Sequence, residues 1–273
     1  LPTRGAPINL QFESIKRVTI NARTMEDVIM SAVFLRPGDQ AKVHFTIERA
    51  DLRRWRVIES EVRELLHFDG RLTGLDDNLL FRRRRVKAGQ SVFLMGQPFD
   101  GLYVVRLGNL KTAITYDDGG EHVLGFAMKG GLLGIDGICK NQYRSEAVAL
   151  TDCDLIRLPA NELFSSGRSC SDLERIAYWA ISREVVKDQT SYALSHAAKS
   201  EVRVARFIQL QSECFASMGY SPRSFTLPMT RRDIGSYLGV TLETVSRALS
   251  ALDHLGILKV VNRQIVINSP QAL

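Results

Sequence analysis

Glycines separate a series of short apolar segments between residues 81 and 158, and this feature restricts the fold of the chain more than any other. The segments include SVFLM, GLYVVRLG, LKTAITY and HVLGFAM. Short strands at regular spacing with turn residues between them are typical of a compact antiparallel barrel or roll. The DGG step at 118–120 suits a hairpin turn between two of the strands. We therefore predict an α+β chain whose residues 61–160 form an antiparallel β-roll. The arginine run 82–85 at its entrance is interpreted as a solvated strand edge.

Residues 1–60 show no such pattern. Their charges are mixed, and they have neither a clear period nor regular glycine punctuation. Three interpretations stay open for this N-terminal extension: an arm, a small helical cap, or residues that precede a true start at Met25 or Met30.

A run without glycine or proline extends from Ser171 to about Lys199 and predicts one long helix. We interpret the segment 161–199 as a dimerisation helix. A line of positions in it follows alternating steps of three and four, as in the seam of a two-stranded coiled coil: Tyr178, Ile181, Val185, Asp188 and Tyr192. The alternative is that this stripe packs against the roll. An acid in the middle of a seam weakens pairing, so Asp188 would make the dimer conditional.

Residues 200–273 carry the signals of a small separate domain. Thr230 and Asp233 form the pattern of a capping box, and Gly239 ends the helix that they begin. Thr241 then suits the N-cap of a second helix. Two helices joined by a short glycine-containing turn make a helix-turn-helix. Apolar positions recur at core spacing in the second helix: Val245, Ala248, Leu249 and Leu252.

The outward face of that second helix carries Glu243, Ser246 and Arg247, which lie three and four positions apart. An arginine binds guanine O6 and N7, a carboxylate accepts from cytosine N4, and a serine hydroxyl adapts to either kind of base edge. The first turns of the second helix are also where a recognition helix meets the major groove. The alternative is an ordinary solvated helix with a Glu–Arg pair.

The chain around this helix favours DNA binding over the solvated helix. The segments ILKVV, NR and QIVI after it predict a short hairpin, which makes the domain winged. We expect a group of side chains to contact phosphates, which set the register of a protein on DNA without reading its sequence: Arg231, Arg232, Thr241, Lys259 and Arg263. Residues 201–273 contain eight Lys/Arg and five Asp/Glu, an excess consistent with a polyanionic partner.

Composition agrees with a DNA-binding protein and argues against several other classes. The formal net charge is +6 and the pI is about 9.2. No apolar run is long enough for a membrane span, so we expect a cytoplasmic protein without a membrane partner. No order of Ser, His and Asp, no pair of acids and no P-loop supports an enzyme.

The cysteines do not form a site. Cys139, Cys153, Cys170 and Cys214 are widely spaced, without a C-x-x-C motif, and predict neither a metal centre nor a disulfide framework. We interpret them as reduced thiols, with a redox-sensing thiol as the alternative.

Together these residues resemble the Crp/Fnr family of transcription regulators, over roughly 61–270. The resemblance implies a β-roll of the cyclic-nucleotide-binding type (a double-stranded β-helix), a dimer helix and a winged helix-turn-helix. FASMGYSPRSFTLPMTRRDIGSYLGVTLETVSRAL is similar to Fnr-type members throughout, and Glu243, Ser246 and Arg247 match their E-x-x-S-R signature. Crp-type members carry Gly in place of Ser246. The resemblance therefore implies TTGAT-type half-sites in a dyad, a homodimer, and RNA polymerase as a partner.

One departure from the family concerns iron–sulfur chemistry. Fnr-type members hold an oxygen-sensing 4Fe–4S cluster with N-terminal cysteines and one cysteine in the roll, whereas the first 138 residues here contain no cysteine. Ile156 stands at the matching roll position, and Cys153 is out of register. We therefore expect no Fnr-type cluster.

A second departure concerns cyclic AMP. Crp-type pockets bind its ribose with a Gly-Glu pair and its phosphate with an Arg-Ser pair, and a guanidinium with a hydroxyl suits a phosphate. Gly134, Arg144 and Ser145 match part of such an effector pocket, but Ile135 replaces the glutamate and Asp136 stands one position late. We expect no bound cyclic nucleotide and predict no other cofactor.

The sequence thus predicts a homodimeric, sequence-specific DNA-binding regulator that is not an enzyme and is controlled through its abundance. The alternative is a sensory β-roll gated by a cyclic nucleotide, haem or a thiol, with DNA binding dependent on that ligand. His122 and Cys139 lie in the roll but suggest no pair of haem ligands.

Overall fold

The computed structural model describes residues 19–20, 30–31, 56–68, 80–116, 119–163, 172–195 and 199–273. The chain divides into two compact units, Leu1–Arg54 and Trp55–Leu273. In the first unit, β1 (Thr19–Ile20) pairs with β2 (Met30–Ser31) in antiparallel fashion. The remainder of that unit, and with it the choice among the three interpretations of the extension, lies outside the described residues.

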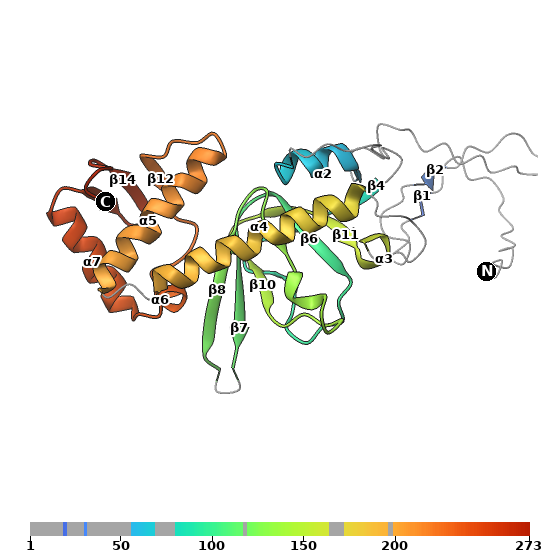
Figure 1. The fold of residues 1–273 in the computed structure, drawn as a ribbon, viewed down its shortest axis with the longest axis horizontal. Coiled ribbons are helices and arrows are strands. Elements are labelled where there is room, and N and C mark those ends of the chain that lie inside the picture. Colours follow the sequence, from blue (N-terminus) through green and yellow to red (C-terminus); the bar gives the residue numbers. More distant parts are fainter. Residues whose placement is uncertain are drawn as a thin grey trace, which may run out of the picture. The chain divides into compact units, whose positions relative to one another are not determined.

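The second unit begins with a β-roll made of two antiparallel sheets (Figure 1). Their strand orders are β3-β4-β11-β6-β9 and β5-β10-β7-β8. The bounds are β3 Arg56–Ile58, β4 Leu80–Val86, β5 Ser91–Phe93, β6 Gly101–Leu107, β7 Leu110–Thr115, β8 Glu121–Ala127, β9 Leu132–Leu133, β10 Glu146–Ala149 and β11 Cys153–Pro159. The hairpin between β7 and β8 contains Gly119 at φ 80°, a left-handed conformation that favours glycine. The predicted antiparallel roll of an α+β chain is confirmed.

Strand β6 lies within the larger sheet and is buried on both faces. Leu102, Tyr103, Val104 and Val105 are each at most 1% exposed. The helices α2 (Glu59–Leu65) and α3 (Ala160–Leu163) contact this strand from outside the roll. Each buried aliphatic side chain of this kind stabilises the fold by about 1.5–3 kcal/mol.

The arginine run 82–85 is not the solvated strand edge that the sequence predicted. Strand β4 pairs with β3 on one side and with β11 on the other, so it lies inside the sheet. The Arg83 side chain is 14% exposed and forms an ion pair with Asp154. Arg106 joins this pair at 3.3 Å and reaches Glu61 of α2 at 2.8 Å. The other three arginines of the run are exposed, as expected.

The long helix α4 (Asp172–Ser195) follows the roll and has 24 residues, all within the predicted span 171–199. Lys199 is extended, and a separate helix, α5 (Ser200–Ser217), begins after it. Ile176, Ala177 and Ala180 of α4 belong to the core of the roll. Among the helices that the structure describes, none combines the length and apolar character that a membrane crossing requires.

Most of the described residues of the predicted seam lie on the face of α4 that points away from the roll. Tyr178 is 58% exposed and Val185 is 47% exposed, so these two side chains do not pack on the roll. Ile181 is half-buried and does contact the roll core, so the packing alternative is correct for this one of the four seam positions whose side chains the structure describes. Asp188 is exposed; Tyr192 belongs to α4, but its side chain lies outside the described part.

The C-terminal module contains the predicted helix-turn-helix and wing. Its elements after α5 are β12 (Ser224–Thr226), α6 (Arg231–Leu238), α7 (Leu242–His254), β13 (Leu258–Val261) and β14 (Gln264–Ile267). The three strands form a sheet in the order β12-β14-β13, and α7 packs against α5 and α6. Val245, Ala248, Leu249 and Leu252 all belong to the core of this module, as their spacing predicted.

Polar groups of the β7–β8 hairpin contact α6. Lys111 Nζ lies 2.9 Å from Asp233 Oδ1 and 2.5 Å from Glu121 Oε1. The Val123 amide donates to Ser236 Oγ at 2.9 Å, and this hydroxyl donates to the Glu121 carbonyl at 2.9 Å. The roll and the C-terminal module are therefore joined by a polar contact that the sequence did not suggest.

Candidate nucleic-acid interface

Local hydrogen bonds fix the beginnings of α6 and α7. Thr230 Oγ1 accepts from the Asp233 amide at 3.1 Å, and Asp233 Oδ2 accepts from the Thr230 amide at 2.8 Å, so the capping box is complete. Gly239 ends α6 with φ 63°, again in the left-handed region. Thr241 caps α7, because its hydroxyl accepts from the Thr244 amide at 3.2 Å. The turn between the two helices is thus specified by the residues that predicted it.

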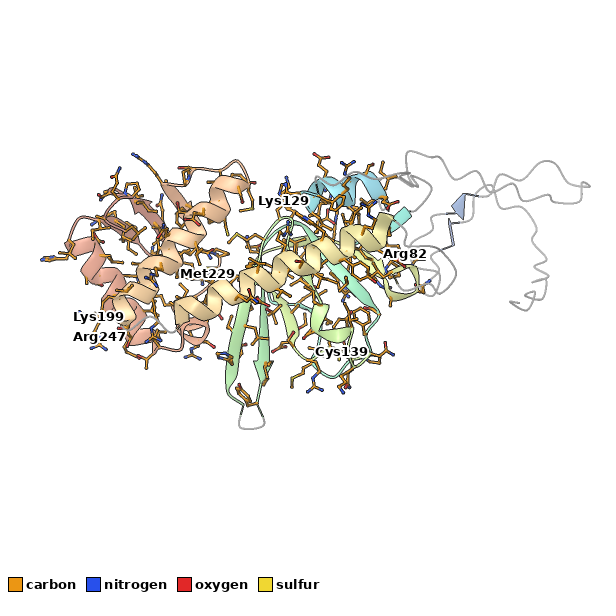
Figure 2. The ribbon with its side chains drawn as sticks, viewed as in Figure 1. Arg82, Lys129, Cys139, Lys199, Met229 and Arg247 are labelled. Atoms are coloured by element: carbon orange, nitrogen blue, oxygen red, sulfur yellow. The ribbon has the colours of Figure 1, made fainter. Side chains whose placement is uncertain are left out.

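Glu243 and Arg247 are exposed on the first turns of α7, on the face opposite its buried residues. The pKa of Glu243 is lowered by hydrogen bonds from its own amide and from the Thr241 hydroxyl, and also by the charge of Arg247. The carboxylate is therefore ionised at neutral pH and suits the positive end of the helix dipole. Arg247, labelled in Figure 2, lies within 3.4 Å of the Thr244 hydroxyl and otherwise projects into solvent.

Ser246 has a different environment from the other two members of the predicted reading face. It is half-buried, and its Oγ accepts a hydrogen bond of 3.2 Å from Arg231 Nη1 on α6. The sequence placed Arg231 with the phosphate contacts and Ser246 with the base contacts, and it did not predict that they touch. No local pattern signals this pair, since the packing of one helix on the other brings the two residues together.

A hollow of about 390 Å³ lies between α6 and the turn of the wing. Two of the predicted phosphate contacts, Arg231 and Arg263, line this hollow together with several apolar side chains. The lining residues are Leu227, Met229, Thr230, Arg231, Ile234, Leu249, Asn262, Arg263 and Ile265. Arginine side chains around such a hollow form a surface that suits an anion.

The candidates for phosphate contact other than Arg231 are all exposed. Lys259 on β13 is 63% exposed and pairs loosely with Asp253 at 3.3 Å. Arg263 at the wing donates to the Pro228 carbonyl at 3.1 Å, which orients its guanidinium beside the hollow. Arg232 is exposed on the first turn of α6. The Thr241 hydroxyl is already used as the cap of α7 and is 3.1 Å from the Thr244 hydroxyl.

Two of the predicted effector-pocket residues, Arg144 and Ser145, meet at the carboxylate of Asp136. The Ser145 hydroxyl donates to Asp136 Oδ2 at 2.7 Å, and the Arg144 amide donates to the same oxygen at 3.2 Å. The Ser145 hydroxyl and the Arg144 amide are therefore both engaged by one carboxylate of the roll itself. A Cβ on Gly134 would lie 2.9 Å from the Tyr143 ring, so this aromatic side chain fills the space behind the glycine.

The described cysteines differ in their surroundings. Cys153 is buried, Cys214 is half-buried and Cys139 is exposed. Burial raises the pKa of Cys153 and of Cys214, which lowers the fraction of reactive thiolate. Cys170 lies outside the described residues.

Known proteins share both parts of this architecture. Residues 202–273 match the Crp-like helix-turn-helix domain, and residues 83–166 match the cyclic nucleotide-binding domain. The chain is 36% identical over 197 residues to the fumarate and nitrate reduction regulatory protein of Yersinia pestis, which covers 72% of this chain and 79% of that protein. It is 36% identical over 191 residues to the transcriptional regulatory protein Btr of Bordetella pertussis, which covers 69% of this chain and 78% of the relative. The solved structure of FixK2 from Bradyrhizobium japonicum matches with a TM-score of 0.63 and 28% identity, over 71% of this chain and 96% of FixK2.

The fold and the exposed helix define a class: a DNA-binding transcription regulator with a cyclic-nucleotide-binding-like roll and a winged helix-turn-helix. More specifically, the chain belongs to the Crp/Fnr family of transcription regulators. The resemblance that the sequence motifs suggested is therefore confirmed.

Proposed function

We propose that this protein is a homodimer that binds TTGAT-like half-sites arranged as a dyad, and that it needs no Fnr-type iron–sulfur cluster. The observation that carries the proposal is the exposure of Glu243 and Arg247 on the first turns of a capped recognition helix. Glu243 is ionised and accepts from cytosine N4, while Arg247 donates to guanine O6 and N7. Each well-formed contact of the bidentate type discriminates against a wrong base by about 1–3 kcal/mol.

The proposed register on DNA depends on cations around the reading helix. Arg231 and Arg263 beside the hollow, with Arg232 and Lys259, present positive charge to the phosphates on either side of the groove. Such contacts position a protein on DNA and make its affinity depend on salt.

Exposed apolar groups on α4 support the homodimer. Tyr178 and Val185 lie on the face that the roll leaves uncovered, and a second copy of α4 would bury both. A symmetric pair of α4 helices would supply two recognition helices, and a dyad of half-sites requires them to lie about 34 Å apart, one turn of DNA.

The residues present do not fit an Fnr-type cluster. The first 138 residues contain no cysteine. The Cys153 thiol is buried and contacts the Thr151 carbonyl at 3.1 Å, inside the structure. If DNA binding needs no oxygen-labile group, the amount of the protein in the cell controls how much DNA is bound. We further propose a cytoplasmic location, RNA polymerase as a partner and no catalytic activity, as for a regulator that acts at promoters.

A second candidate function is a roll gated by an effector, and one observation favours it. A hollow of about 430 Å³ opens in the roll, with aromatic and charged groups in its wall. Its volume falls within the range of about 300–1,000 Å³ that is usual for small-molecule sites. The lining residues are Arg84, Ser91, Val92, Phe93, Leu94, Gln97, Pro98, Asp100, Tyr103 and Tyr143.

The test is fluorescence anisotropy of the full chain, in air and without an effector, on a labelled TTGATNNNNATCAA duplex and on a scrambled duplex of equal composition. We expect the first duplex to bind more tightly by about a thousandfold or more, the usual ratio of specific to non-specific binding. Equal affinity for both duplexes would contradict the proposal. Specific binding only under anaerobic conditions, or only after an effector is added, would support the gated roll instead.

A further inference from the structure

The hydroxyl of Ser246, on the reading face of α7, is held by a residue of the other helix. Arg231 Nη1 donates to Ser246 Oγ at 3.2 Å. Both side chains are half-buried. Partial shielding from water strengthens a charge-assisted hydrogen bond relative to one on an open surface.

The chemistry of the two groups decides the direction of this bond. A guanidinium has five N–H donors and no acceptor, so the serine oxygen must accept. The serine proton is then left for another acceptor. In a helix this acceptor is often the carbonyl one turn earlier, which here is that of Leu242. Within the described part of the chain, Ser246 makes no such bond, and its contact with Arg231 is the one that its hydroxyl forms.

We propose that Arg231 fixes Ser246 as a hydrogen-bond donor toward DNA, so that this position of α7 selects a base with an acceptor on its major-groove edge. The inference rests on the proposed function, because it requires α7 to lie in the major groove. Thymine O4 and guanine O6 and N7 are acceptors, whereas cytosine N4 donates. The bond from Arg231 uses one lone pair of the serine oxygen and polarises its O–H group, which strengthens the hydroxyl as a donor.

Arg231 links this base contact to the DNA backbone. Its side chain also lines the hollow between α6 and the wing, where Arg263 and Thr230 lie. One of its N–H groups serves Ser246, so the others remain for a phosphate. A phosphate bound there would fix the orientation of the Arg231 guanidinium. The Ser246 O–H group, which is bonded to Arg231, would then also keep one orientation. Arg231 is therefore a positioning residue for Ser246 as well as a phosphate contact.

The experiment compares Arg231→Lys, Ser246→Ala and the double variant with the wild type. Arg231→Lys keeps the positive charge but loses the planar fork of donors. Anisotropy is measured on a panel of duplexes in which each base pair of the TTGAT half-site is replaced in turn. We expect both single variants to lose discrimination at the same base pair, by about three- to tenfold, the effect of one hydrogen bond. The double variant is expected to lose no more than Ser246→Ala alone.

Two controls separate positioning from charge and from folding. The slope of affinity against salt for Arg231→Lys should equal that of the wild type, because the charge is retained. Arg206→Lys, at an exposed position of α5 outside the interface, should match the wild type on every duplex. Thermal unfolding of each variant confirms that the module is folded.

The outcomes distinguish this inference from the proposed function. A uniform loss on every duplex with Arg231→Lys, at unchanged discrimination, would limit Arg231 to a phosphate contact and overturn the inference. Additive losses at two different base pairs would overturn it too. If the wild type itself did not distinguish the TTGAT duplex from the scrambled one, the proposed function would fail first.

Discussion

The β-roll and the winged helix-turn-helix module use their polar side chains in opposite ways. In the roll, the groups near the expected effector pocket bond to one another: Ser145 reaches Asp136 at 2.7 Å, and Tyr143 reaches Asp100 at 2.5 Å. Burial and the neighbouring carboxylate of Asp100 raise the pKa of Tyr143, so its hydroxyl stays a donor. In the module, Glu243 and Arg247 remain exposed. These buried groups of the roll bond to one another, whereas the two reading residues of the module remain accessible to a partner.

The difference separates the two regions by function, although both belong to one family architecture. A buried polar group is usually hydrogen-bonded inside the protein, as the hydroxyls of Tyr143 and Ser145 in the roll are. A side chain that reads a base must exchange water for the base edge and therefore has to stay accessible. The variants below test whether the module is the region that responds to a partner.

The largest effect is expected from Arg247→Ala in the module. We expect a loss of about 1–3 kcal/mol per half-site, together with a relaxed preference at the guanine that it reads. Anisotropy on the specific and the scrambled duplex measures both quantities, with Arg206→Ala, at an exposed position of α5, as the matched control. If affinity for the two duplexes fell equally, Arg247 would be a phosphate contact.

The second-largest effect is expected at the contact between the roll and the module. Asp233→Asn is expected to lower the free energy of unfolding by about 1–3 kcal/mol, because the carboxylate caps α6 and pairs with Lys111. Burial alone would raise the pKa of Asp233, but hydrogen bonds from Thr230 and Lys111 outweigh it and lower that pKa. Urea unfolding measures the lost free energy of unfolding. The variant Lys111→Met shows how much of that loss comes from the ion pair between the roll and the module, and how much from the helix cap.

The lowered pKa of Asp233 also gives this contact a pH dependence of known sign. A carboxyl with a lowered folded pKa stabilises the protein fully above its unfolded pKa, which is about 3.9. That contribution is lost as the pH falls through the folded pKa. The wild type should therefore lose stability more steeply than Asp233→Asn below about pH 4. Parallel stability curves for the two proteins would contradict this assignment.

A smaller effect is expected at the uncovered face of α4. Desolvation and the nearby carboxylate of Glu184 raise the pKa of Asp188. Two such acids facing each other across a dimer seam repel by about 1 kcal/mol in a watery environment, so Asp188→Asn should tighten the dimer by that amount. The wild-type dimer should also tighten as the pH falls toward the raised pKa, and the variant should not. Sedimentation equilibrium measures both, and identical association constants at each pH would remove Asp188 from the seam.

The smallest effect is expected from Arg144→Ala in the roll. Arg144 is exposed, and only its backbone amide bonds to Asp136, so DNA affinity should change by less than about 0.5 kcal/mol, as for an ordinary surface residue. Calorimetric titration with cyclic AMP should show no saturable binding for the wild type. Saturable binding that disappears in Arg144→Ala would make the roll a nucleotide sensor. The roll would then also be a region that keeps polar groups for a partner.

Much of the fold could be predicted from local patterns. Glycine spacing located the strands of the roll, because a hairpin turn depends on the few residues within it. Thr230 and Asp233 located α6, since the bonds of a capping box join positions three residues apart. The break between α4 and α5 was less predictable: Lys199 is extended and α5 begins at Ser200, but no glycine or proline in the sequence marks this break.

The exposed reading residues were also predictable, because the position of a side chain around a helix follows from its spacing to the buried stripe. Glu243 and Arg247 lie where that spacing placed them. For Ser246 the same pattern gave the face of the helix but not the hydrogen bond from Arg231.

The sequence by itself determined the elements, their caps and the side chains that face outward on α7. Tertiary structure alone decided which polar groups meet: Arg83 with Asp154, Lys111 with Asp233, Arg231 with Ser246. These partners stand 71, 122 and 15 residues apart. A local pattern is set by neighbours within one turn or one hairpin, whereas a side-chain pair of this kind forms when separate elements pack together. The sequence therefore does not show these three pairs, which form only when the chain has folded.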